Sequence, residues 1–141
     1  PSAEKHLKAA LKADPQMAQA AYNLCIITAR DRITEAVTYC RKAVELKSDE
    51  AKYAYSLALF LDRSGDRPGA VQTLDAIIAK HPSYGNAYAL LGEIYEKQGE
   101  ERAAEQVYRK ALGTEGIDSR QKKLFAARLG QLNKEGQDRQ K

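Results

Sequence analysis

The residues that could carry chemistry in this chain are few, and they lie far apart. The two histidines, His6 and His81, have no carboxylate or cysteine at the spacing of a metal site, so both are expected on the surface. The sequence contains no GxSxG motif, no Walker-type glycine loop and no HExxH motif. We therefore expect no enzyme, no cofactor, no metal site and no small-molecule substrate.

Cys25 and Cys40 both fall at apolar positions of a helical pattern. The sequence has neither a CxxC spacing nor a second pair of cysteines, which would indicate a metal or redox site. We expect buried thiols that act as small hydrophobic residues. In an oxidising compartment the alternative is a disulfide, which would need Cα atoms within about 7 Å of each other.

Charge is unevenly distributed along the chain. Residues 119–141 carry seven Lys/Arg and two acidic residues, whereas the whole chain carries 23 and 19. The earlier acidic residues recur at helical surface spacing, which is typical of a solvated helix face. The basic end is expected to be a solvated terminus. The alternative is a nucleic-acid-binding arm, whose affinity would fall steeply with salt.

The chain has 141 residues, of which 43% are hydrophobic and 30% charged, and this composition predicts one folded domain. It has no run of eighteen apolar residues, so we expect no membrane span. The first residues lack the basic start and apolar stretch of a signal peptide, so the chain shows no targeting signal and its compartment stays open.

An internal repeat organises these residues. Residues 53–78 align with residues 87–112 at a constant offset of 34. Residues 20–46 join the alignment when their inner loop is one residue shorter. The alignment places Cys25, Ala58 and Gly92 at one position, and Cys40, Leu74 and Tyr108 at another.

Each repeat contains two helical patterns of about thirteen residues, with apolar or small residues at intervals of three and four. Gly65 and Gly99 stand where a first helix would end, because glycine adopts the left-handed conformation without a Cβ penalty. Asp31 and Asp66 stand where a second helix would be capped.

The first helix has small, Leu, Gly/Ala and Tyr positions, and the second has Ala, an aromatic residue, Ala and Pro. This pattern resembles the tetratricopeptide repeat. The resemblance implies an all-α fold, a right-handed α-solenoid of antiparallel helix pairs. The expected domain covers residues 1–133, followed by a basic disordered tail at 134–141. Within the domain we expect a half repeat at 2–13, repeats at 18–48, 51–82 and 85–116, and a capping helix at 119–133.

Gly92 interrupts an otherwise good helix, at a cost of roughly 1 kcal/mol relative to alanine. Because it aligns with Cys25 and Ala58, we interpret it as a packing residue that lets the paired helix approach closely. Tyr88, Tyr95 and Tyr108 align with packing positions of the family and are expected in the core.

The resemblance also implies a concave groove, lined chiefly by first helices, that binds an extended or helical peptide. A partner with apolar anchors and an acidic group near Arg30, Lys52 and Arg63 would suit its composition. The alternative is that these are ordinary exposed side chains without a partner. The groove positions that carry over are Gln19, Tyr22, Ile26 and Arg30 in the first full repeat, Lys52, Tyr55, Leu59, Asp62 and Arg63 in the second, and Asn86, Ala89, Glu93, Glu96 and Lys97 in the third.

Some relatives bind the terminal carboxylate of chaperone peptides with a Lys, Asn, Asn, Lys and Arg clamp. Asn23 and Lys52 match two of these positions, but Ser56 replaces the arginine. This subclass is therefore disfavoured.

Two further alternatives stay open. Since the chain starts at a second helix, it could be a structural or regulatory segment of a larger polypeptide, such as a bacterial enzyme or electron carrier, packed on its own upstream domain. The stripe of apolar residues in the capping helix could also dock a partner helix.

The expected partner is a protein or peptide, and nucleic acid is disfavoured. The expected oligomeric state is a monomer or weak oligomer.

Overall fold

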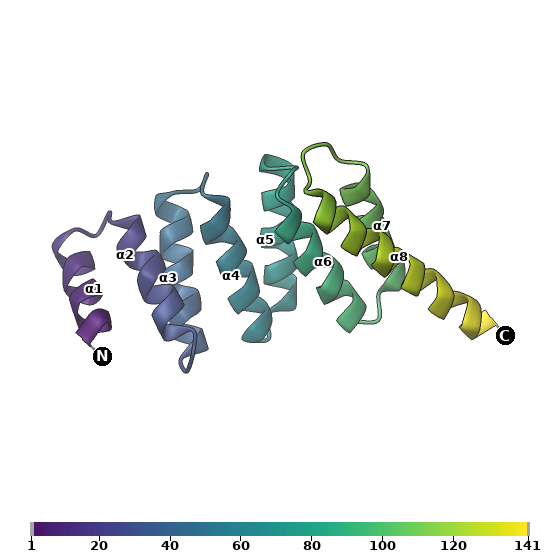
Figure 1. Ribbon diagram of the computed structural model, residues 1–141. Helices are drawn as coiled ribbons and strands as arrows, with labels where there is room; N and C mark the ends of the chain where they lie inside the picture. Colours follow the sequence, from purple (N-terminus) through teal and green to yellow (C-terminus); the bar gives the residue numbers. More distant parts are fainter. Residues whose placement is uncertain (1, 141) are drawn as a thin grey trace. The chain divides into compact units, whose positions relative to one another are not determined.

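The computed structural model describes residues 2–140, which form eight α-helices and no strand (Figure 1). These residues divide into two compact units, 2–73 and 74–140, and each unit is described by itself. Helix α5 (Arg67–Lys80) runs from the first unit into the second.

The first unit contains α1 (Ser2–Ala13), α2 (Ala18–Thr28), α3 (Ile33–Leu46), α4 (Ala51–Arg63) and the start of α5. Helix α2 packs against both α1 and α3, and α3 packs against α4. The connecting turns are short, so neighbouring helices run antiparallel (Figure 1).

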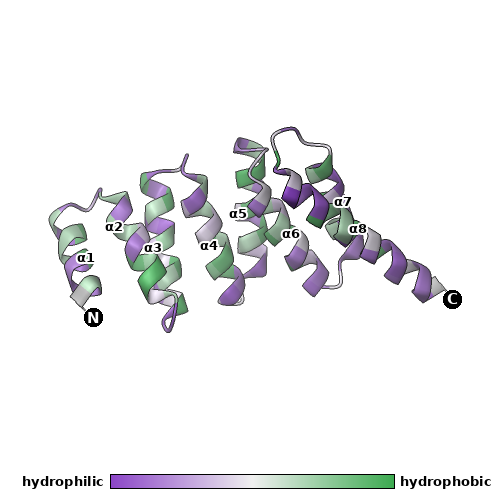
Figure 2. Ribbon diagram, in the orientation of Figure 1, coloured by the Kyte–Doolittle hydropathy of each residue, from purple (hydrophilic) through white to green (hydrophobic). Residues whose placement is uncertain are grey.

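The second unit contains the end of α5 with α6 (Gly85–Lys97), α7 (Glu101–Leu112) and α8 (Ser119–Gln140). Helix α7 packs against both α6 and α8. The sequence predicted a tail without regular structure from residue 134, but α8 continues to Gln140. The final turns are hydrophilic (Figure 2), and an ion pair from Arg139 to Glu101 of α7 holds them.

Small and large apolar residues alternate at the helix interfaces. In α3, Ala36, Cys40 and Ala43 recur at intervals of four and three and are completely buried. The same spacing in α7 buries Ala104, Tyr108 and Ala111. Exposed polar residues occupy other positions of these helices, such as Thr34, Thr38 and Arg41 in α3 and Arg102 and Gln106 in α7. The all-α class and the helical repeat expected from the sequence are confirmed.

The turn glycines behave as predicted. Gly65 has φ +98° and Gly99 has φ +76°, values that favour glycine. Helices α4 and α6 each end in a backbone hydrogen bond that spans the glycine, from Asp66 N–H to the Leu61 carbonyl at 2.8 Å and from Glu100 N–H to the Tyr95 carbonyl at 2.9 Å. This is the Schellman arrangement of a helix end.

Only one of the two predicted aspartate caps forms. The Asp66 carboxylate accepts a hydrogen bond from Gly69 N–H at 2.9 Å, as a capping residue does at the start of α5. Asp31 does not cap α3. The residue directly before that helix is Arg32, whose side chain makes no capping hydrogen bond. The Asp31 carboxylate instead pairs with the Arg32 guanidinium at 3.6 Å. At the offset of 34 that aligns the second helices, Arg32 and not Asp31 corresponds to Asp66.

Gly92 is the packing residue that the sequence predicted. A Cβ at this position would overlap the phenol ring of Tyr108, which comes from the paired helix α7. Tyr88 and Tyr108 are buried, as expected, whereas Tyr95 is only half-buried. Burial, together with a hydrogen bond that the Tyr108 hydroxyl donates to Glu96, raises the pKa of Tyr108.

The cysteines are buried, but they are not free thiols. Cys25 of α2 and Cys40 of α3 form a disulfide with a Cα–Cα distance of 5.2 Å. The alternative prediction of a disulfide is therefore confirmed, and the favoured prediction of free thiols is wrong. Both residues are fully buried, so only their thiol state was wrong.

Candidate peptide-binding surface

Helices α2 and α4 of the first unit carry most of the predicted groove residues. Leu24 and Cys25 anchor one side of α2 in the core, and Ile26 on the same helix is exposed. Arg30 lies in the turn that follows α2. In α4, the buried residues Leu57 and Ala58 orient Lys52 and its neighbours in the same way.

Tyr22 is buried, with 7% of its surface exposed. Its ring stacks on Tyr53 with the centroids 4.5 Å apart, and its hydroxyl shares a 3.0 Å hydrogen bond with the Ser56 hydroxyl. The ammonium of Lys52 lies 5.3 Å from the centre of the same ring. This is a cation–π distance, so Tyr22 positions a surface cation and joins α2 to α4.

A shallow hollow of about 490 Å³ brings three predicted residues together. The most exposed of its aliphatic side chains is Ile26, at 44%. Its lining combines mostly apolar side chains with one amide and one ammonium group. The lining residues are Leu7, Tyr22, Asn23, Ile26, Ile27 and Lys52.

The sequence did not assign Leu7 and Ile27 to a binding surface. A signal was nevertheless present, because Ile27 aligns with Phe60 and Ile94 in the later repeats. Those two residues are 5% and 0% exposed, whereas Ile27 is 37% exposed. A packing position in the later repeats is thus partly open in the first.

The remaining predicted residues of the first unit differ in exposure. Gln19 is bonded to its neighbours, since it accepts a hydrogen bond from the Tyr53 hydroxyl at 3.2 Å and donates one to Asn23 at 3.0 Å. Tyr55 and Leu59 are half-buried, and Arg30 is exposed.

Asp62 and Arg63 make contacts within the protein. The Asp62 carboxylate pairs with Arg67 at 3.3 Å, and its side chain is only 9% exposed. The Arg63 guanidinium lies 5.6 Å from the centre of the Phe60 ring. The carboxylate therefore adds little negative charge to the surface, while the guanidinium stays exposed.

The predicted residues of the third repeat are occupied by contacts within the second unit. Asn86 accepts a hydrogen bond from Gln121 at 2.7 Å, and Glu93 pairs with Lys97 at 3.4 Å. The Glu96 carboxylate accepts the Tyr108 hydroxyl hydrogen bond and lies 3.9 Å from Arg128. Glu96 thus supports the packing of α6 on α7 and α8.

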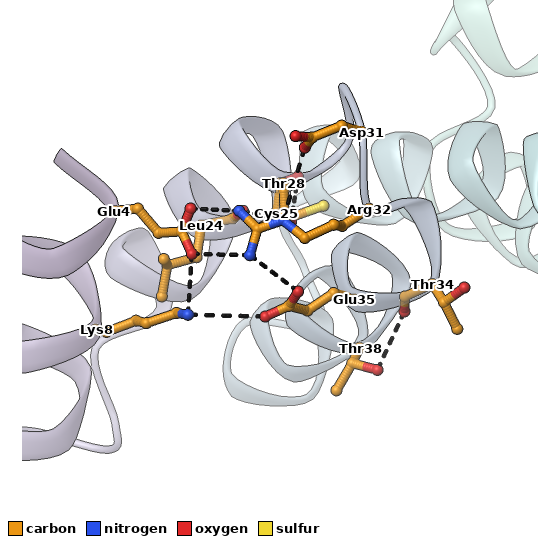
Figure 3. A network of polar contacts seen from close by, with 10 residues as sticks. All are labelled: Glu4, Lys8, Leu24, Cys25, Thr28, Asp31, Arg32, Thr34, Glu35 and Thr38. Carbon is orange, nitrogen blue, oxygen red and sulfur yellow. Dashed lines mark hydrogen bonds and ion pairs between the residues drawn. The ribbon is translucent and has the colours of Figure 1, made fainter. Parts of the chain in front are cut away.

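A cluster of ion pairs joins α1 to the start of α3 (Figure 3). The Arg32 guanidinium contacts Glu4, with Nη1–Oε2 at 3.0 Å, and Glu35 at 3.2 Å. Lys8 contacts Glu4 at 2.9 Å and Glu35 at 3.8 Å. The hydrogen bond from Arg32, with that from Lys8, lowers the pKa of Glu4 to about 2.

Within residues 2–140, no three His, Cys, Asp or Glu side chains are grouped in a way that could hold a metal ion. None of the described helices combines the length and apolar character that a membrane crossing would require.

Known structures share this fold. The chain resembles a crystal structure of a MamA protein (26% identity, TM-score 0.71, 78% of this chain and 61% of that one). It also resembles YrrB, described as a TPR protein with an unusual peptide-binding site (20% identity, TM-score 0.70, 78% and 57%). A tetratricopeptide repeat protein from Parabacteroides merdae is 21% identical, with a TM-score of 0.76 and coverages of 94% and 53%. The chain thus spans between half and two thirds of each of these three proteins.

A search of curated proteins found no match. A sequence profile of the tetratricopeptide repeat matches residues 1–51 and 55–120, which is most of the chain. Proteins of this class are generally non-catalytic scaffolds that bind protein or peptide partners. The helix pairs, the turn glycines and the profile match together show that the chain belongs to the tetratricopeptide repeat family.

Proposed function

We propose that this chain is a non-catalytic interaction module whose first unit binds a peptide segment on the surface of α2 and α4. The observation that carries the proposal is the hollow around Ile26, whose lining combines apolar side chains with Lys52, the ammonium group of which lies over the Tyr22 ring. Such a combination can recognise an apolar side chain and a nearby carboxylate at the same time.

Exposed cations of the first unit favour an acidic peptide, and one of them, Lys52, lines the hollow. Lys52, Arg30 and Arg63 are exposed cations, whereas Asp62 is paired with Arg67. Burial of one aliphatic anchor would contribute about 1.5–3 kcal/mol. The cations would add selectivity and salt dependence more than affinity.

The test is selection of binders from a displayed library of random 15-residue peptides. Selected peptides are expected to combine a large apolar residue with Asp or Glu, and to lose at least tenfold in affinity against Ile26→Glu and Lys52→Glu variants. Arg41→Glu, a charge reversal at an exposed site on α3, is the matched control. Circular dichroism must show equal helicity in all variants.

Equal binding by the hollow variants and the control would contradict a binding site at this hollow. Selected peptides without acidic residues would contradict the charge argument alone.

A second function is favoured by the exposed face of α1: the chain as a structural segment packed on another part of a larger polypeptide. Ala3 is exposed, and Leu7 and Ala10 are half-buried. The equivalent residues in every later second helix are at most 3% exposed. They are Ala36, Ala70 and Ala104 for Ala3; Cys40, Leu74 and Tyr108 for Leu7; and Ala43, Ile77 and Ala111 for Ala10. In the later repeats this face packs on a first helix, so the same face of α1 suits a helix of that type.

An Ala3→Cys variant tests this second function through maleimide labelling. The added thiol should react quickly in the present chain, because Ala3 is exposed and the native cysteines are bonded. In a longer polypeptide that includes this chain, labelling should slow by at least tenfold if another segment covers α1. Equal labelling rates in the two proteins would contradict this function.

A further inference from the structure

The disulfide joins the two helices of the first repeat at the position where the later repeats use a different contact. Cys25 and Cys40 align with Gly92 and Tyr108. In the third repeat the ring of Tyr108 fills the space beside the Gly92 backbone. In the first repeat two sulfur atoms occupy this place, so a covalent bond replaces the packing of a large ring.

The end of α2 also lacks the glycine turn of the later repeats. No residue between α2 and α3 has a positive φ, and the chain turns through a hydrogen bond from Arg32 N–H to the Thr28 carbonyl at 2.8 Å. The buried Thr28 hydroxyl donates to the Leu24 carbonyl at 2.8 Å. This hairpin has neither the Schellman turn of the second and third repeats nor the aspartate cap of the second, and the disulfide joins its two helices.

Helix α2 supplies Tyr22, Asn23, Ile26 and Ile27 to the hollow. The disulfide lies on the opposite, buried side of the same helix. At the start of α3, Arg32 and Glu35 take part in the ion-pair cluster with α1 (Figure 3). Because α2 supplies four of the six lining residues, a shift of α2 on α3 would change the hollow.

We propose that the Cys25–Cys40 disulfide is a structural clamp that holds α2 on α3, so that the peptide-binding surface is complete only in the oxidised protein. The regulatory part of this inference rests on the proposed function at the hollow. The clamp implies that the chain acts in a compartment where disulfides form and persist.

The burial of both sulfurs makes the clamp resistant to reduction while the hairpin is closed. A dithiol such as dithiothreitol reduces it by thiolate attack on one sulfur and then closes its own disulfide. Two electrons and two protons pass to the protein, which ends with two thiols. Because the attacking thiolate needs access, this exchange must wait until α2 separates from α3.

The experiment compares three samples by hydrogen exchange. The first is the oxidised protein. The second is the protein reduced while unfolded and refolded in dithiothreitol. The third is a Cys25→Ala/Cys40→Leu variant, which copies the Ala58 and Leu74 pair at the same positions of the second repeat.

Reduction should speed exchange in α2 and α3 by about a hundredfold, the factor expected for a cross-link between residues 15 apart. Exchange in α6 and α7 is the internal control and should not change. The variant should exchange more slowly than the reduced protein, with no response to dithiothreitol. Equal exchange in the oxidised and reduced proteins, or two free thiols in the protein purified without reductant, would overturn the clamp.

Binding of a selected acidic peptide separates the two proposals. Weaker binding after reduction, with full binding by the oxidised protein, supports control of the hollow by the clamp. Unchanged binding despite faster exchange in α2 would overturn that control. If no peptide binds the oxidised protein, the proposed function fails, while the exchange data still decide whether the clamp exists.

Discussion

Single residues decide how closely the helices of this protein approach. Gly92 has no side chain, and the Tyr108 ring occupies the space where a Cβ would lie. Tyr108 is itself 1% exposed and bonded to Glu96, so the ring has little room to move. The propensity cost of a glycine within α6 is therefore offset by the contact of a whole aromatic ring with the helix backbone.

A Gly92→Ala substitution should lower the free energy of unfolding by about 1–2 kcal/mol, because overpacking outweighs the gain in helix propensity. Gly130→Ala in α8 is the matched control. No atom lies within 4 Å of the Cβ that it would add, so it should raise stability by up to about 1 kcal/mol. Urea denaturation of the two variants measures both changes. A stabilised Gly92→Ala variant would contradict the packing role.

At the scale of elements, charged side chains attach α1 to the hairpin of α2 and α3. Glu4 of α1 receives a hydrogen bond from Arg32, which directly precedes α3. It also receives one from Lys8, one turn further along α1. The cluster is absent from the repeat pattern, because its members belong to positions that vary between the repeats. It makes the docking of α1 dependent on the charge of one carboxylate.

Acid should weaken this docking. The pKa of Glu4 in the folded protein is about 2, below its ordinary value of 4.5, chiefly because Arg32 donates a hydrogen bond to the carboxylate. The stabilisation is fully present above pH 4.5 and is lost as the pH falls toward 2. NMR titration of the Glu4 carboxyl and of the α1 amides measures both effects. Arg32→Gln should return the pKa toward 4.5, and Lys8→Gln should shift it less; equal titration in all three proteins would exclude the ion-pair explanation.

For the whole molecule, repetition made most of the fold predictable. The 34-residue offset, the apolar intervals and the glycines at 65 and 99 indicated eight helical segments in nearly their observed places. Local rules suffice for this because each helix pair repeats the same face and the same turn. The helical end of α8 was missed, since its contacts with α7 are not encoded in local propensity.

The candidate surface was less predictable than the fold. Ile26 and Lys52, two of the predicted groove residues, are exposed, but the burial of Tyr22 and the internal bonds of Glu96 depend on residues distant in sequence. Whether any of these residues binds a peptide stays a prediction.

By itself, the sequence determined the all-α class, the repeat family, the turn glycines and the packing role of Gly92, because all of these follow from periodic local patterns. Only the tertiary structure decided the disulfide, the Glu4–Arg32 cluster and the hollow formed with Leu7 and Ile27. Each of these joins side chains from different helices. Their distances depend on how the helices pack, and spacing along the chain does not specify that.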